Sequence, residues 1–328
     1  MTLNFETEFL IRELKKRKPK KVLVQLAEGI KQNAIDFAPV FEKLGIETIF
    51  SGETEWGACA PAIQEAEALG VDLLVHFGHA EFIKVDFPIL YVEVRDELDL
   101  TPLLEKSLKA IKKYKKIGYS YSIQHRHDTE KVVKFYEKHG KKVVLSKKLG
   151  HVAYEGHIVG CQYAGLKSIE KEVDCFVIMG NQFHGMGTVL SVDKPVVLVD
   201  VYNDEVRELS GLRDRILKQR MASIEKFRQA KNVGIIIEIK PGQKFGSPNY
   251  LLEKLREQGK NPILITMNEM TPDKILNFYS IDAFIELACP RIAIDDFAKY
   301  PRTIITFKEA LVALGIKSWE DMLKIGLV

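Results

Sequence analysis

The chain alternates short apolar stretches with amphipathic stretches, and this alternation starts three times. The rounds begin at residues 21–25, 116–121 and 233–239. Apolar strands that alternate with helical stretches are typical of β-α-β units, in which parallel strands form a sheet covered by helices. We therefore expect an α/β protein with three similar small parallel-sheet domains and flanking helices, arranged around a central site.

Each round has four predicted strands. They are 21–25, 47–50, 72–77 and 89–94; then 116–121, 142–145, 175–179 and 195–201; then 233–239, 262–266, 283–288 and 303–306. The predicted helices are 5–17, 30–44, 60–69, 101–113, 128–139, a long polar helix over 205–230, then 249–258, 272–279, 307–314 and 318–325. The expected domains are 1–105, 106–215 and 216–328, with one of the cysteines Cys59, Cys161 and Cys289 in each.

Charge and hydropathy exclude some partners. The chain has 48 basic and 45 acidic residues, which does not favour nucleic acid as a partner. No apolar run is long enough to span a bilayer, and the charges scattered through residues 1–21 do not resemble a signal peptide. We therefore expect a cytoplasmic protein without a membrane partner. In a reducing compartment its four cysteines are expected to be buried, catalytic or metal-binding, rather than paired in disulfides.

Three cysteines lie where strands or loops end. Cys289 follows an apolar run and precedes Pro290, which cannot continue a strand ladder. Cys59 and Cys161 lie in glycine-containing loops after predicted strands. Ligands of α/β proteins bind beyond the carboxyl ends of the strands, so we expect these three thiols to meet at one metal site. Cys175 opens an apolar run and is expected in the core.

The spacing of the cysteines is a weak signal, because it lacks the local pattern of common metal sites. The plain alternative is that all four are small buried apolar side chains. The positions of Cys59, Cys161 and Cys289 outside apolar runs favour a site instead. Three thiolates can hold a 4Fe-4S cluster and leave one iron open for a substrate.

Several segments around these cysteines resemble the archaeal diphthamide-synthesis radical enzymes. The matching segments are Trp56-Gly57-Ala58-Cys59, Val159-Gly160-Cys161-Gln162, residues 288–296 around Cys289, residues 72–79 and Lys240-Pro241-Gly242-Gln243, with residues 180–185 less close. The resemblance runs through the whole chain, and the Cys289 segment is the most specific.

The resemblance implies a 4Fe-4S cluster held by Cys59, Cys161 and Cys289, with S-adenosylmethionine as substrate. The reduced cluster cleaves the bond from sulfur to the methionine γ-carbon, which gives a 3-amino-3-carboxypropyl radical and methylthioadenosine. The radical adds to a histidine of translation elongation factor 2, the first step of diphthamide biosynthesis. A homodimer and an external electron donor are also implied.

Other candidate binding residues lie at strand ends or beside a cysteine, and each has a plain alternative. Arg291 is suited to a substrate carboxylate, or else to a surface or interdomain salt bridge. The other candidates lie at strand ends or in the third domain, and ordinary helix caps, loop histidines or a turn would also explain them. They are Gln25, Glu28, Gly29, His79, His184, Gly242 and Gln243.

Three alternative functions stay open from the sequence. Quinolinate synthase also takes one cysteine from each of three α/β domains, and there the cluster is a Lewis acid for dehydration; the short motifs here do not look like that family. The second alternative is a cluster-free nucleotide-binding protein. The third is a supporting subunit that keeps the fold and the cluster.

Overall fold

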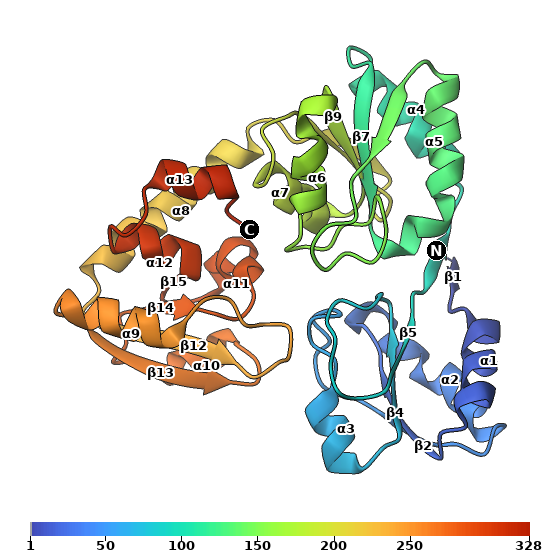
Figure 1. The fold of residues 1–328 in the computed structure, drawn as a ribbon, viewed down its shortest axis with the longest axis horizontal. Helices are drawn as coiled ribbons and strands as arrows, with labels where there is room; N and C mark the ends of the chain where they lie inside the picture. Colours follow the sequence, from blue (N-terminus) through green and yellow to red (C-terminus); the bar gives the residue numbers. More distant parts are fainter. Residues whose placement is uncertain (1) are drawn as a thin grey trace.

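The computed structural model describes residues 2–328 and contains three separate parallel sheets, each flanked by helices (Figure 1). In the described part of the chain, no helix combines the length and the apolar character needed to cross a membrane. The predicted α/β architecture of three small parallel sheets is confirmed.

The first sheet has the strand order β3-β2-β4-β5, with all strands parallel. Its elements are α1 (Thr7–Arg17), β2 (Lys21–Gln25), the 3-10 helix η1 (Glu28–Asn33), α2 (Ala34–Glu42), β3 (Glu47–Phe50), α3 (Ile63–Leu69), β4 (Leu73–Phe77) and β5 (Ile89–Val92). A two-stranded antiparallel ribbon of β1 (Thr2–Asn4) and β6 (Arg95–Glu97) lies beside it.

The second sheet repeats this order as β8-β7-β9-β10 and adds the antiparallel strand β11 at the edge. Its elements are α4 (Thr101–Ala110), β7 (Lys116–Tyr121), η2 (Ile123–Asp128), α5 (Thr129–Lys138), β8 (Lys142–Leu145), α6 (Ala164–Ile169), η3 (Glu170–Glu172), β9 (Cys175–Gly180), α7 (Gln182–Val189), β10 (Val196–Asp200) and β11 (Glu205–Glu208).

The third sheet has the same order again, β13-β12-β14-β15. Its elements are α8 (Leu212–Gln229), β12 (Asn232–Glu238), α9 (Pro248–Glu257), β13 (Asn261–Met267), α10 (Pro272–Leu276), β14 (Ala283–Glu286), α11 (Pro290–Asp295), η4 (Phe297–Lys299), β15 (Thr303–Thr306), α12 (Phe307–Ala313) and α13 (Trp319–Ile325). The predicted limits at 105 and 215 fall within α4 and α8, so the limits of the domains stay predictions.

One hydrogen-bonding device recurs in all three sheets. The Oδ2 atom of Asp72, just before β4, accepts the backbone N–H groups of Lys20 and Lys21 at 2.7 and 2.9 Å. Asp174 and Asp282 hold the starts of β7 and β12 in the same way. Because a carboxylate with two backbone donors is stabilised in its charged form, the pKa of each aspartate is lowered. The shared device and strand order indicate one unit used three times.

Some predicted elements were wrong. The long helix expected from residue 205 begins only at Leu212, because residues 205–208 pair with β10 as an antiparallel edge strand. The strand expected over 283–288 ends at Glu286, and Cys289 begins α11 instead. The helix expected over 30–44 is divided into η1 and α2. The short helices α6, α7 and α11 were missed, since each has only six to eight residues.

Candidate cluster site

Cys59, Cys161 and Cys289 all line one cavity of about 560 Å³. The cavity also receives Asn181 and His184 from the second sheet and His79 from the first. All three cysteines are half-buried and free, while Cys175 is fully buried in the core of the second sheet, as expected. The carboxyl-end loops of three separate sheets therefore bring three thiols to one enclosed space.

Cys59 lies in the loop between β3 and α3 and contacts a loop of the third sheet. Gln243 Nε2 donates to Cys59 Sγ at 3.5 Å, and the Gly242 N–H donates to the Cys59 carbonyl at 2.8 Å. A Cβ atom on Gly242 would lie 2.8 Å from Cys59 Cα, so only glycine permits this approach. Both predicted residues of the third sheet therefore hold Cys59.

Arg291, from α11, holds the loop that carries Cys161. Its guanidinium donates to the carbonyl oxygens of Gly160 and Phe183 at 2.9 and 2.8 Å, and to Asp295 at 2.9 Å. It also contacts the Tyr163 hydroxyl and lies 3.8 Å from the centre of the Phe183 ring. Because its donors are engaged within the protein, these contacts assign Arg291 first to positioning, and its binding of a substrate carboxylate stays a prediction.

Cys289 is the N-cap residue of α11. A buried ion pair holds this helix in place. Arg220 of α8 donates to both carboxylate oxygens of Glu309, at 2.7 and 2.8 Å, and to the carbonyls of Ala293 and Ile304. Arg220 and Glu309 are fully buried. A buried charge is tolerated only when it is paired and hydrogen-bonded, and this pair fixes α11 against β15.

Burial raises the pKa of each of the three thiols. For Cys161 the pKa rises to about 12, with burial as the largest cause and the Cys59 thiol as the next. Burial also raises the pKa of Cys59 and, well above the ordinary value, that of Cys289, which Glu286 and the other two thiols raise further. Without a cation the thiols are protonated. A metal centre would supply the positive charge that stabilises three neighbouring thiolates.

The other predicted residues divide into two groups. Gly29, His79 and His184 line the cavity. His184 Nδ1 lies 2.9 Å from Asn181 Oδ1, and burial, followed by the charge of Arg291, lowers the pKa of His184 to about 3, so this imidazole is neutral.

Gln25 and Glu28 are not among the residues that line the cavity. The buried Gln25 amide bonds the Ala60 carbonyl and the Ala62 N–H, while Glu28 accepts the Glu55 N–H at 3.1 Å and pairs with Lys31 at 2.7 Å. Both residues support the loop that carries Cys59 from outside the cavity.

Two buried residues beside the cavity were not predicted as site residues. Glu55 precedes Cys59 in its loop, and His76 lies on β4 within an otherwise apolar strand. A histidine inside an apolar strand was the one available signal. Glu55, in contrast, stands in a polar stretch where nothing in the sequence marks it.

Comparisons with known proteins agree on one family. The family model for diphthamide synthesis proteins matches residues 26–324. The chain is 30% identical to 2-(3-amino-3-carboxypropyl)histidine synthase of Pyrococcus horikoshii, over 94% of this chain and 90% of that protein. It is 28% identical to subunit 1 of the human 2-(3-amino-3-carboxypropyl)histidine synthase, over 97% of this chain and 73% of that protein.

Solved structures agree with this result. The crystal structure of Dph2 from Pyrococcus horikoshii aligns with a TM-score of 0.88 and 28% identity, covering 97% of this chain and 93% of that one. A structure of the same protein with a 4Fe-4S cluster aligns with a TM-score of 0.87, at the same identity and coverage.

Proposed function

Because the chain belongs to the family of diphthamide synthesis proteins, we propose that it is a 2-(3-amino-3-carboxypropyl)histidine synthase. In this proposal the enzyme transfers the 3-amino-3-carboxypropyl group of S-adenosylmethionine to a histidine of translation elongation factor 2. The observation that carries the proposal is that Cys59, Cys161 and Cys289, one from each third of the chain, line one cavity.

The same three cysteines would hold a 4Fe-4S cluster. Their donor chemistry suits it, since thiolates are the usual ligands of iron–sulfur clusters and three of them leave one iron open. When bound, the cluster supplies the single electron that cleaves a carbon–sulfur bond of the sulfonium.

The residues of the chain orient the reacting groups and exclude water. Gln243 donates to the sulfur of Cys59, and hydrogen bonds to sulfur tune the reduction potential of clusters. Arg291 fixes the Cys161 loop through the Gly160 and Phe183 carbonyls. The half-buried thiols face the cavity, whose walls would limit the access of bulk water to the reacting carbon.

Substrate contacts are proposed for the predicted residues that face the cavity. Gly29, His79 and His184 line it and would contact S-adenosylmethionine. Gln25 and Glu28 would act through the loop of Cys59, and Gly242 and Gln243 through Cys59 itself. We further propose that the protein works in the cytoplasm as a homodimer, takes its electron from an external donor, and acts on elongation factor 2 as its protein substrate.

Anaerobic incubation of the reduced, reconstituted protein with S-adenosylmethionine and elongation factor 2 tests this function. We expect methylthioadenosine by chromatography, and an added 3-amino-3-carboxypropyl group on one histidine by mass spectrometry. Formation of 5′-deoxyadenosine instead would refute the proposed bond cleavage. Quinolinate from its precursors would support the Lewis-acid alternative, and absence of iron and sulfide after reconstitution would support a cluster-free binding protein.

A further inference from the structure

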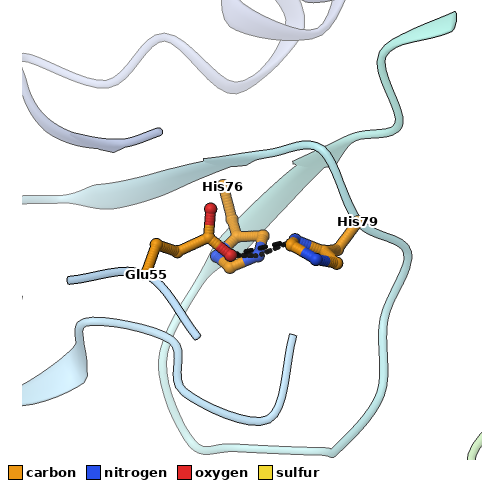
Figure 2. Close-up of side chains that lie close together, drawn as sticks. All are labelled: Glu55, His76 and His79. Atoms are coloured by element: carbon orange, nitrogen blue, oxygen red, sulfur yellow. Dashed lines mark hydrogen bonds and ion pairs between the residues drawn. The ribbon is translucent and has the colours of Figure 1, made fainter. Parts of the chain in front are cut away.

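A second group of metal-ligand atoms lies beside the cavity. Glu55, His76 and His79 direct their side chains toward one point (Figure 2). Glu55 Oε1 lies 2.9 Å from His79 Nδ1 and 3.3 Å from His76 Nε2, and these two nitrogens are 3.3 Å apart. The side chains of Glu55 and His76 are fully buried, and that of His79 is 31% exposed.

Neighbouring hydrogen bonds fix the tautomer of His76. The Gln25 amide is oriented by the backbone, because its Nε2 donates to the Ala60 carbonyl and its Oε1 accepts the Ala62 N–H. The Nδ1 atom of His76 lies 2.9 Å from this same Oε1 and must therefore donate to it. In the neutral ring, Nε2 then presents its lone pair to the Glu55 carboxylate.

The contacts of Glu55 within the protein are incomplete. Within residues 2–328, neither carboxylate oxygen of Glu55 receives an aligned hydrogen bond, although two ring nitrogens approach Oε1. A cation held between the buried carboxylate and the imidazole lone pair would satisfy both groups.

We propose that Glu55, His76 and His79 bind one divalent transition metal ion, such as Zn²⁺ or Fe²⁺. Two histidines and one carboxylate form a known three-ligand set for both ions. Bonds of about 2.0–2.1 Å in tetrahedral geometry place ligand atoms roughly 3.3 Å apart, close to the observed separations. Gln25 Oε1 accepts a hydrogen bond from the other ring nitrogen of His76, as metal-binding histidines usually require.

The ion would brace the loop that carries Cys59. Its ligands join this loop, through Glu55, to β4 and the turn that follows it. His79 lies against the same loop, because a Cβ atom on Gly57 would be 3.7 Å from His79 Nε2. None of the three ligands is a cysteine, and although His79 also lines the cavity, metal binding can be measured without the proposed reaction.

Metal analysis of the full-length protein tests the site. The protein is stripped with a chelator and incubated anaerobically with Zn²⁺ or with Fe²⁺, and the bound metal is counted by mass spectrometry. A variant with serine at Cys59, Cys161 and Cys289 removes the thiols as competing ligands. We expect one ion per chain in this variant, and at least about tenfold weaker binding after His76→Ala or His79→Ala.

Matched substitutions separate metal binding from folding. Glu55→Gln keeps the side-chain volume and removes the charge, so it should weaken binding by at least the same factor. His139→Ala, on an exposed histidine at the end of α5, is the control and should bind as the parent does. Circular dichroism checks that each variant is folded.

Two further measurements do not depend on activity. In the variant that lacks the three thiols, Zn²⁺ should raise the thermal midpoint, and it should not do so when His79→Ala is added, because only a bound ligand stabilises the folded state. In the same thiol-free variant Co²⁺ should give visible d–d bands, and these should be absent when His76→Ala is added. The proposal is overturned if the stripped protein binds neither Zn²⁺ nor Fe²⁺, or if the Glu55, His76 and His79 variants bind as the parent does.

Discussion

The first and third sheets place different side chains at equivalent positions. Counted from the aspartate that holds the first strand, the seventh residue is His79 in the first sheet and Cys289 in the third. In the second sheet the same position is Asn181, and all three residues line the shared cavity. The end of the third strand therefore faces the centre in every copy, and the copies differ in the chemistry that they present there.

Loop length explains why the third copy uses this position for its sulfur. In the first two copies, long loops after the second strand, 51–62 and 146–163, carry Cys59 and Cys161. In the third copy only residues 268–271 separate β13 from α10. That loop is short, so the thiol comes from the end of β14 instead. In the first copy the corresponding position is left to His79 and its buried partners.

The largest effect, on iron content and product formation, is expected at the seventh residue after the aspartate, which is Cys289 in the third sheet. Cys289→Ser should reduce the iron of the reconstituted protein to well below the about four per chain of an intact cluster. Product formation should fall by more than about 100-fold, beyond the 10–100-fold typical of supporting residues. Iron and sulfide assays with chromatography of the nucleoside measure both quantities.

Asn181→Ser is the matched control, because serine can keep the cap on α7 that Asn181 provides. This variant should retain its iron. A Cys289→Ser protein with a full complement of iron would show that the third copy does not supply a ligand.

A smaller effect, on thermal stability, is expected at the fourth residue after the aspartate. This residue is His76 in the first sheet and Glu286 in the third. Burial raises the pKa of Glu286 well above its usual value. The pKa of Glu286 in the folded protein exceeds its unfolded value of about 4.3. The stabilising contribution of the protonated Glu286 is therefore full below pH 4.3, and it is lost as the pH rises toward the folded pKa. Glu286→Gln should therefore have a thermal midpoint similar to the parent at pH 5 and a higher one at pH 8. Equal pH dependence in parent and variant would contradict this.

The smallest effect is expected at the aspartates themselves. Asp72, Asp174 and Asp282 are exposed, and hydrogen bonds from two backbone N–H groups lower the pKa of each. Because the folded pKa lies below the unfolded pKa of about 3.9, their contribution is present above pH 3.9 and is lost as pH falls through the folded pKa.

Each Asp→Asn variant should therefore lower the urea midpoint slightly at pH 7 and lose less stability than the parent on acidification. Urea titrations at neutral and acidic pH measure this. If one aspartate had a far larger effect than the other two, the three copies would not be equivalent at this position.

The sequence predicts the parallel sheets well, because strands buried on both faces, such as β9 and most of β10, are apolar runs. It does not predict β11, whose charged residues have one exposed face and find their partner only at the edge of a finished sheet. The meeting of the three cysteines was expected from strand ends and from resemblance to a family. The Glu55–His76–His79 group was not, because it depends on how the loop after β3 folds back over β4. The role of Arg291 was also hidden, since Gly160 and Phe183 lie more than a hundred residues away.

The contact of Arg291 with the Cys161 loop has a consequence for the way in which the protein would lose activity. Within residues 2–328 the three parallel sheets share no strand, so side-chain contacts such as that of Arg291 with the Gly160 carbonyl help to set the spacing between them. Loss of such a contact would leave each sheet and its helices folded, while the three sulfur atoms would move away from their common point. The protein would then lose activity before it unfolds. A sample whose thermal unfolding, measured by calorimetry, is unchanged would already be inactive.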